Sequence, residues 1–305
     1  MKISVCIATF KRLDRLALVL GDLASQSLLP HQVTVVDNDV QGSAMQVVTR
    51  FIESNPGFLV VYDIQSERNI ARTRNRTVSL AIGDWLAFID DDERAPKTWL
   101  QDLFEFAVNN NADGVLGPVI PVVPDDAPTW IRRGKFYDFP RLPTGSVVPL
   151  NRMRFGNLIL RGEPLRALAG PFDERYGLMA GEDGDLLVRM VANGAHIVWN
   201  DEATVQEPVE RSRLSIEWLM QRALGGGQEF ARKTMLGRYG HVTLARKVRF
   251  FLLAGMQAAV AIVLTLGTLP FGLHHAAHWL TRVCANVGKL SILWGGRHKE
   301  YAALK

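Results

Sequence analysis

Short apolar runs alternate with helical patterns through the first 120 residues of this 305-residue chain, and this alternation is what most limits its fold. Each run is rich in β-branched or aromatic residues and is followed by apolar residues at helical spacing. A repeat of roughly 25 to 30 residues is typical of βαβ units, so it predicts an α/β fold with a wound, mainly parallel sheet. The predicted strands are 3–8, 33–36, 58–64, 85–89 and 115–120.

The run at 85–89 ends in four consecutive acidic residues, Asp90 to Glu93. Carboxylates crowded at the end of a buried strand repel one another unless a cation lies among them. Oxygen ligands of this kind suit Mg²⁺ or Mn²⁺, whose coordination is often completed by the phosphates of a substrate. A solvated acidic turn is the simpler alternative. Asp37 follows the run at 33–36, and because parallel strands end at one edge of a sheet, we expect these acidic groups to converge.

The segment 67–76, which lies between the two acidic strand ends, contains four arginines. Arginines for phosphates beside acidic ligands for a metal favour a nucleotide-diphosphate site. No GxGxxG motif follows the first strand and no GxxxxGK[ST] motif occurs, which disfavours dinucleotide oxidoreductases and P-loop enzymes. A second acidic pair, Glu182 and Asp183, opens a later helical pattern. Partners of the helix dipole are the simpler interpretation of this pair, and acid–base chemistry on a hydroxyl is the alternative.

Charge is unevenly distributed along the chain. Residues 206–305 carry 14 Lys and Arg against 5 Asp and Glu, whereas residues 1–205 carry 21 against 26. This asymmetry favours two surfaces with different partners, and we expect no nucleic acid among them. The two cysteines form no disulfide framework and fit a reducing compartment. The apolar run at the N-terminus is too short for a signal-peptide core, so we do not expect secretion.

The C-terminal region contains a long apolar stretch, 250–269, with almost no polar side chain. Its length makes it a candidate membrane helix, and a buried core helix is the alternative. Basic residues flank it on both sides, which opposes a single crossing. Because Pro270 and Gly272 break the run, we expect a hairpin or an in-plane helix pair at about 250–294 with basic flanks against anionic lipid, and two spans as the alternative.

Five motifs in order give the front two-thirds of the chain a resemblance to the family 2 inverting glycosyltransferases of the GT-A fold. They are ISVCIATFKR (3–12), VVDN (35–38), ARTRN (71–75), FIDDD (88–92) and GED (181–183). The tail resembles that of bacterial exopolysaccharide glycosyltransferases of the succinoglycan type, in EPV (207–209), RSRL (211–214) and RALGG (222–226). The resemblance implies a GT-A, Rossmann-like transferase domain at 1–209 and a basic helical region at 210–305.

The resemblance also implies roles for individual residues. The donor would be a nucleotide sugar, most often a UDP sugar, bound with Mn²⁺ or Mg²⁺. Asp90 and Asp92 resemble the DxD metal ligands, with Asp92 the first choice and Glu207 as an extra ligand where many relatives have a His. Asp183 would be the catalytic base, with Glu182 as the alternative. Expected donor contacts are Ala8, Thr9, Phe10, Arg12, Asp37, Asn38, Asp39, Arg74, Asp90 and Asp91, and expected acceptor contacts are Trp130, Asn157 and Gly181.

The implied reaction is transfer of one sugar, with inversion, to a hydroxyl of a polyprenyl-diphosphate-linked glycan in bacterial exopolysaccharide synthesis. The enzyme would sit at the inner (cytoplasmic) membrane with its catalytic domain on the cytoplasmic face. Ala8 stands where the family often has Pro, and the QxxRW signature of processive synthases is absent. Two alternatives are a nucleotidyltransferase of sugar-nucleotide metabolism, which would typically show a Gly-rich loop after the first strand, and a non-catalytic membrane scaffold on the same fold.

Overall fold

The structure, a computed structural model, describes residues 1–296 and 298. Its contacts divide the chain into two compact units. The first comprises Met1–Ile120, Phe139–Gly177 and Glu182–Glu207, and the second comprises Pro121–Asp138, Leu178–Gly181 and the described residues from Pro208 onward. The domain boundary at 209/210 stays a prediction, since two short segments that precede it group with the C-terminal residues.

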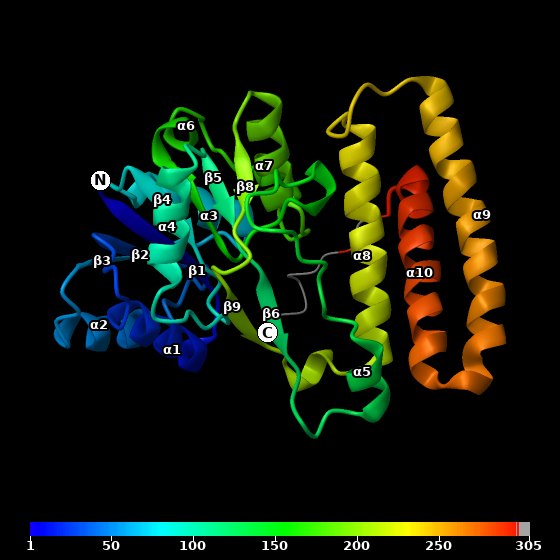
Figure 1. Cartoon of the computed structure of the whole chain (residues 1–305), viewed down its shortest axis with the longest axis horizontal. Helices are drawn as coiled ribbons and strands as arrows, with labels where there is room; N and C mark the ends of the chain where they lie inside the picture. The colour runs from blue at the N-terminus through cyan, green and yellow to red at the C-terminus, as the bar shows by residue number, and fades with distance from the viewer. Residues whose placement is uncertain (297, 299–305) are drawn as a thin grey trace. The chain divides into compact units, whose positions relative to one another are not determined.

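The first unit is built on a seven-stranded sheet with the strand order β3-β2-β1-β4-β7-β5-β8 (Figure 1). The pairs among β1 to β4 are parallel, β7 is antiparallel to β4 and β5, and β5 is parallel to β8. The predicted α/β class with a mainly parallel sheet is confirmed. The strands are β1 (Ile3–Thr9), β2 (Gln32–Asp37), β3 (Leu59–Ile64), β4 (Trp85–Phe88), β5 (Gly114–Leu116), β7 (Leu158–Arg161) and β8 (Ile197–Trp199).

Helices cover both faces of this sheet. Ile3, Val5 and Ile7 of β1 belong to the core that α1, α2 and α4 share. Cys6 points the other way because side chains alternate along a strand, and its Sγ lies 3.9 Å from the Thr77 carbonyl oxygen of α3. The helices of this unit are α1 (Leu13–Ala24), α2 (Met45–Glu53), α3 (Ile70–Leu80), α4 (Trp99–Asn109), α6 (Gly162–Arg166) and α7 (Glu182–Ala192), with short 3-10 turns η1 (Leu150–Arg152) and η2 (Glu174–Tyr176).

The predicted strand 115–120 is wrong as one element, because the chain turns at Gly117 and Pro118. A Cβ on Gly117 would lie 2.0 Å from the Ala203 carbonyl oxygen, so only glycine fits this close approach. Proline has no N–H to continue the ladder. The run therefore splits into β5 in the large sheet and β6 (Val119–Val122), which pairs with β9 (Val205–Pro208) in a separate two-stranded sheet.

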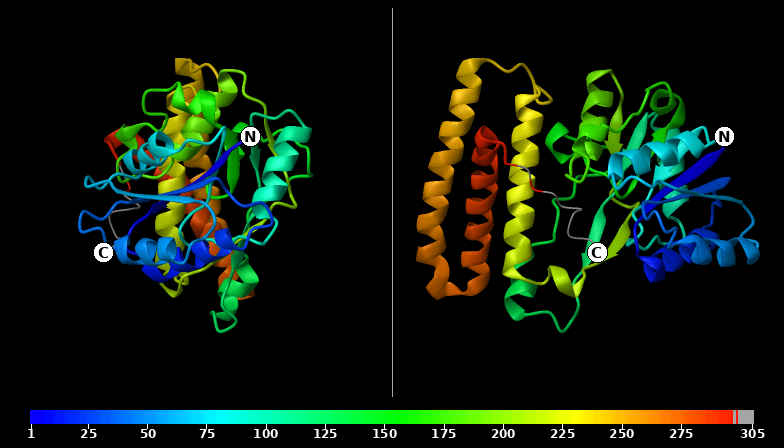
Figure 2. Two further views of the ribbon diagram at one scale, coloured as in Figure 1. Left: turned by 90° about the vertical axis from the view of Figure 1, so that its left-hand side faces the viewer. Right: turned by 180° about the vertical axis from the view of Figure 1, so that it is seen from behind.

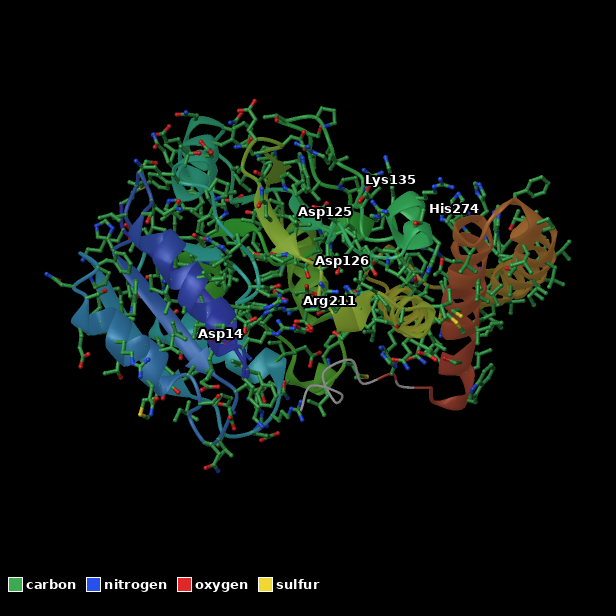
Figure 3. The ribbon with its side chains drawn as sticks, turned by 90° about the horizontal axis from the view of Figure 1, so that it is seen from below. Asp14, Asp125, Asp126, Lys135, Arg211 and His274 are labelled. Carbon is green, nitrogen blue, oxygen red and sulfur yellow. The ribbon has the colours of Figure 1, made fainter. Side chains whose placement is uncertain are left out.

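The second unit is mainly helical. It contains α5 (Thr129–Gly134), η3 (Arg211–Arg213), α8 (Ile216–Met235), α9 (Leu244–Thr268), η4 (Leu269–Phe271), α10 (Leu273–Ser291) and η5 (Ile292–Trp294). Within it α10 packs against both α8 and α9 and lies between them (Figures 1 and 2). Arg211 pairs with Asp126 at 2.6 Å (Figure 3), linking η3 to the segment Pro121–Asp138. In the described part of the chain, one helical stretch, Leu244–Phe271, is long and apolar enough to cross a membrane.

Candidate active site

The carboxyl ends of β1 and β4 lie side by side, and polar side chains from both ends are bonded to each other. The Thr9 hydroxyl donates to Asp91 Oδ2 at 2.8 Å. Arg12 Nη1 lies 2.9 Å from Asp91 Oδ1 and 2.9 Å from Asp92 Oδ2, and Arg15 Nη1 lies 3.8 Å from Asp92 Oδ2. The loop after β1 therefore meets the acidic end of β4, and arginines partly balance the acidic charge. The predicted convergence of Asp37 with these acidic groups stays a prediction.

Asp37, at the end of β2, is completely buried and holds the following loop. Its Oδ1 accepts from the Asp39 amide at 2.9 Å, and its Oδ2 accepts from the Ala44 amide at 2.8 Å and the Tyr62 hydroxyl at 3.0 Å. Burial and the Asp37 charge raise the pKa of Tyr62, so this phenol stays a donor. The contacts of Asp37 favour a structural role for its carboxylate, whose contact with a donor stays a prediction.

Asn38 connects the end of β2 to the start of α3. Its Nδ2 donates to the carbonyl oxygens of Gln65 at 2.9 Å and Glu67 at 2.8 Å, and its Oδ1 accepts from the Asn69 amide at 3.0 Å. Asn69 in turn caps α3 by accepting from the amides of Ala71 and Arg72. Asn38 thereby sets where α3 begins, and with it the position of the arginines on that helix.

Two further predicted donor residues lie at the end of β1 and just after it. Ala8 and Phe10 are half-buried, and the Arg68 guanidinium lies over the Phe10 ring at 4.4 Å from its centroid. An aromatic ring paired with a guanidinium offers two planar surfaces for stacking. Arg68 was not among the predicted site residues, although it belongs to the basic segment that the sequence indicates.

Arg74 brings three carboxylates together from β4 and α7. Its Nη1 lies 2.6 Å from Glu182 Oε1 and 3.9 Å from Asp183 Oδ2, and its Nη2 lies 3.3 Å from Asp90 Oδ1. The guanidinium also lies over the rings of Phe155 and Phe172, at 5.1 and 5.9 Å from their centroids. The acidic end of β4 therefore meets the acidic start of α7, and Arg74 is the cation between them.

The two candidate bases differ in exposure. Only 1% of the Glu182 side chain is exposed, and its carboxylate is held by Arg74. The Asp183 side chain is 24% exposed. Its Oδ1 accepts from the Gly184 amide at 2.6 Å and its Oδ2 from the Phe155 amide at 3.2 Å, which fixes the carboxylate at the start of α7. A base must reach its substrate, so the geometry favours Asp183 over Glu182, whose contacts suit positioning of Arg74.

The carboxylates that follow β4 are strongly perturbed. Burial raises the pKa of Asp91 to about 6 against the opposing charge of Arg12. Burial and repulsion from Asp90 raise the pKa of Glu93 well above its usual range, and Glu207 adds to this repulsion. Desolvation raises the pKa of Asp90 although its side chain is partly exposed; Arg74 opposes this rise, and Asp92 and Asp183 add to it. The negative charge here exceeds what the neighbouring arginines offset.

A divalent cation would relieve this repulsion. Carboxylate oxygens are the donors that Mg²⁺ and Mn²⁺ prefer, so the chemistry of Asp90 and Asp92 fits either metal. Within residues 1–296 and 298, however, no three His, Cys, Asp or Glu side chains gather as a ready-made metal site. Glu207 lies in β9 and acts electrostatically on Glu93. The assignment of Asp90, Asp92 and Glu207 as metal ligands stays a prediction.

Gly156 is a site residue that the sequence predictions missed, and Glu93, although part of the acidic run, was given no role of its own. Asp90 donates its amide to Glu93 Oε2 at 3.0 Å. Gly156 has a φ of +107°, and a Cβ there would lie 2.5 Å from Glu93 Oε1. The glycine thus makes room for the buried carboxylate that orders the turn after β4. The available signal was the fourth acidic residue of the run 90–93.

The predicted acceptor residues lie in different parts of the fold. Asn157 belongs to the first unit and is buried; its Nδ2 donates to the carbonyl oxygens of Pro118 and Ala203 at 3.0 and 2.6 Å, and its Oδ1 accepts from Trp99 Nε1 at 2.8 Å. These bonds favour a structural role for its side chain. Trp130 and Gly181 belong to the second unit, where Trp130 is half-buried against Phe136. Their contact with an acceptor stays a prediction.

The mainly parallel seven-stranded sheet with helices on both faces agrees with the predicted GT-A fold. Residues 4–162 match the family model described as Glycosyl transferase family 2. The chain therefore belongs to glycosyl transferase family 2 and is a glycosyltransferase. This membership favours a glycosyltransferase over the two alternatives, a nucleotidyltransferase and a non-catalytic scaffold.

Comparison with individual proteins agrees with this family. The chain is 33% identical over 235 residues to the succinoglycan biosynthesis protein ExoM of Rhizobium meliloti (strain 1021), covering 76% of this chain and 75% of that protein. Among solved structures, it is similar to the mannosyltransferase PcManGT from Pyrobaculum calidifontis in complex with GDP-Man and Mn²⁺, with a TM-score of 0.66, 17% identity and coverage of 96% and 87% of the two chains. It is also similar to S. aureus TarS 1-349 in complex with UDP-GlcNAc, with a TM-score of 0.56, 19% identity and coverage of 97% and 92%.

Proposed function

We propose that this glycosyltransferase moves one sugar from a nucleotide sugar, in a metal-dependent and inverting reaction, to a hydroxyl of a lipid-linked glycan in bacterial surface polysaccharide synthesis. The observation that carries the proposal is the convergence on Arg74 of carboxylates from the end of β4 and the start of α7. The acidic group after β4 would act at the diphosphate side of a sugar bound there, and the acidic group of α7 would act at its acceptor side.

The reaction follows from the charges of these groups. The acceptor oxygen attacks the anomeric carbon, its proton goes to the Asp183 carboxylate, and the bond to the diphosphate breaks with its electron pair on the leaving oxygen. A single displacement inverts the anomeric carbon. Two amide donors and Arg74 orient Asp183 at the start of α7. General-base assistance of this type contributes about 10²–10⁴-fold to rate.

We infer that the donor is a UDP sugar and that the cation is Mn²⁺ or Mg²⁺. The similar structures named above hold GDP-Man with Mn²⁺ in one case and UDP-GlcNAc in the other, which supports a nucleotide-sugar donor. Asp90 and Asp92 would hold the cation, which would supply Lewis-acid stabilisation of the departing diphosphate. Arg12 would approach the phosphates, and Phe10 with Arg68 would stack against the base.

We further infer a lipid-linked acceptor, such as a polyprenyl-diphosphate-linked glycan, and attachment to the cytoplasmic face of the inner membrane. The printed name of the ExoM relative supports a place in exopolysaccharide synthesis. The exposed apolar helix α9 and the excess of basic residues after residue 205 support contact with anionic lipid. Attachment would confine the enzyme and a lipid-linked acceptor to one surface.

A screen of nucleotide sugars tests the donor, the metal and the acceptor. Full-length protein is incubated with UDP and GDP sugars, with Mn²⁺, Mg²⁺ or EDTA, and with membrane lipid extract, and released nucleoside diphosphate is measured. We expect release with one UDP sugar that depends on the metal and rises with the extract. Release that is unaffected by EDTA would contradict metal dependence. The same assay on Asp92→Asn tests the role of that carboxylate, and Asp14→Asn, which removes the charge of an exposed carboxylate on α1 (Figure 3), is its control.

A further inference from the structure

We propose that α9 lies in the plane of an anionic membrane surface, with its outer face in the lipid interface, and that it does not cross the bilayer. This inference rests on the membrane attachment in the proposed function and adds the orientation of the helix. It concerns only the second unit, whose helices α8, α10 and α9 lie side by side (Figures 1 and 2).

The surface of α9 is divided into a narrow packed side and a broad apolar outer side. Its buried residues are small: Ala254, Ala258 and Ala261. Large apolar side chains are exposed on the opposite side: Leu252 (69%), Met256 (59%), Val263 (69%) and Leu266 (69%). They lie on one face of the helix and span 15 residues, which is a length of roughly 21 Å along its axis. Contiguous exposed apolar surface of this kind needs a partner.

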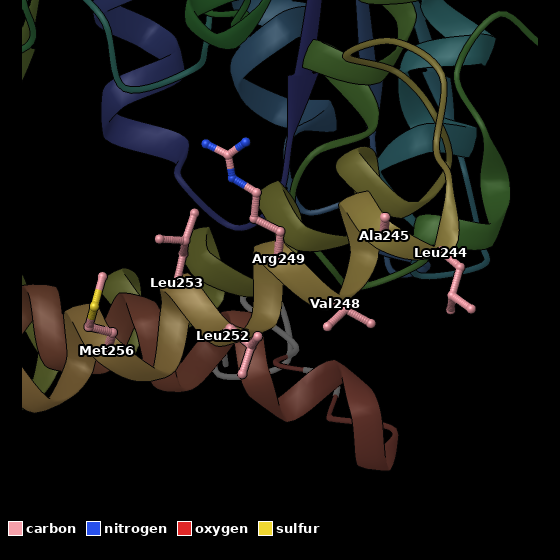
Figure 4. A pocket seen from close by; sticks show the side chains of 7 residues that line it. All are labelled: Leu244, Ala245, Val248, Arg249, Leu252, Leu253 and Met256. Atoms are coloured by element: carbon pink, nitrogen blue, oxygen red, sulfur yellow. The ribbon is translucent and has the colours of Figure 1, made fainter.

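An open, shallow apolar surface extends along the first half of this helix (Figure 4). It is lined by Val248, Leu252, Leu253 and Met256 together with Arg249. A guanidinium at the rim of an apolar face is the arrangement expected at a lipid surface, where the methylenes contact acyl chains and the charge meets headgroups.

The neighbouring helix α10 is unsuited to the bilayer interior. Its exposed positions include His275, His278 and Arg282, which are polar and fall on one side of the helix. Arg282 lies near the middle of α10, with its guanidinium 4.9 Å from the centre of the Trp279 ring. An arginine at the centre of a membrane helix lowers the insertion equilibrium by roughly 100-fold.

The close packing of α8 on α10 adds a second obstacle to spanning. A Cβ on Gly227 would lie 2.0 Å from the Ala285 carbonyl oxygen, and one on Gly288 would lie 2.2 Å from the Leu224 carbonyl oxygen, so the two helices touch through their backbones. α8 carries the ion pair of Glu229 with Lys233 at 2.6 Å. If α9 crossed the bilayer, α10 and α8 would enter it alongside, with their charges. An in-plane α9 leaves both outside the hydrocarbon.

The ends of α9 also suit an interface that carries negative charge. Arg246, Lys247 and Arg249 are exposed at its start, and Phe271 is 75% exposed just after its end. Each basic residue near an anionic surface contributes about fivefold to binding. The three together predict roughly 100-fold tighter binding to anionic than to neutral vesicles.

Depth measurements distinguish the two orientations. The full-length protein carries Cys284→Ser and keeps Cys6, which is buried. One new cysteine is introduced at 252, 256, 263 or 266, and a nitroxide is attached to it. Collision with oxygen and with a polar nickel complex is measured on vesicles of phosphatidylcholine with phosphatidylglycerol. An in-plane helix predicts the same shallow depth at all four sites. A spanning helix centred on the apolar stretch 250–269 predicts that sites 256 and 263 lie about 5 Å deeper than sites 252 and 266, which are nearer its ends. That gradient would overturn the inference.

Two controls separate the possible failures. A label at exposed Ile82 of the first unit should stay in water throughout. Labels that stay in water at all four α9 sites would overturn both the orientation and the membrane attachment, while metal-dependent release of nucleoside diphosphate would still test the transferase activity separately. Equal binding to vesicles with and without phosphatidylglycerol would overturn the anionic partner. Leu252→Glu with Val263→Glu should lower vesicle binding at least tenfold, and Ile82→Glu should not.

Discussion

Removal of Arg74 should destabilise the first unit strongly. Only 9% of the Arg74 side chain and 1% of the Glu182 side chain are exposed, and their ion pair is 2.6 Å long. Breaking a buried ion pair by deleting one partner leaves an uncompensated charge and costs about 3–5 kcal/mol. Arg74→Met should therefore lower the free energy of unfolding by about 3–5 kcal/mol. Urea unfolding followed by near-UV circular dichroism measures the change.

A matched control lies two residues further along α3. Arg76 also pairs with a carboxylate, Asp63, but its side chain is 47% exposed. Exposed ion pairs contribute about 0–1 kcal/mol, so Arg76→Met should cost no more than that. In the double variant Arg74→Met with Glu182→Gln, the buried charge is gone and stability should partly return. If Arg74→Met were as mild as Arg76→Met, the buried pair would not be what holds α3 and α7 together.

Three further outcomes follow from the site. Burial raises the pKa of Asp91 to about 6, so its ionised form costs stability above that pH. The free energy of unfolding, compared with that of Asp91→Asn, should therefore rise as the pH falls from 6 toward 4. Urea unfolding at several pH values measures this difference. Gly156→Ala should cost about 1–3 kcal/mol more than Gly145→Ala in free energy of unfolding, because both have positive φ but only a Cβ at 156 would clash with Glu93 Oε1. Asp92→Ala should remove the metal-dependent part of donor binding in calorimetry, and unchanged binding would contradict a ligand role.

The alternation of the sequence was sufficient to predict the parallel part of the sheet. Buried strands and amphipathic helices leave a periodic signal, and the runs at 3–8 and 33–36 correspond to β1 and β2. The split of the run at 115–120 was missed because it depends on a distant contact. Gly117 is required by the Ala203 carbonyl oxygen, 86 positions away along the chain, and local spacing carries no information about that approach.

The candidate site shows the same division. The acidic run 90–93 and the pair Glu182 and Asp183 were visible in the sequence, and the resemblance gave them roles that stay predictions; the fold shows that Arg74 joins them. The resemblance also implied an acceptor contact for Asn157, but its amide is bonded to the backbone and to Trp99 inside the core. A polar residue in a motif does not reveal whether its side chain faces a ligand or satisfies buried carbonyl groups. Only the fold distinguishes them.

The most direct test of the catalytic centre compares Asp183→Asn with Glu182→Gln in the purified enzyme, with donor affinity and turnover measured separately. The general-base role predicts that Asp183→Asn lowers turnover by about 10²–10⁴-fold while the donor Kd stays unchanged. Glu182→Gln alters the buried partner of Arg74. It should lower the free energy of unfolding and leave the pH dependence of turnover unchanged. Normal turnover by Asp183→Asn would contradict the proposed base and the meeting of β4 and α7 around one sugar.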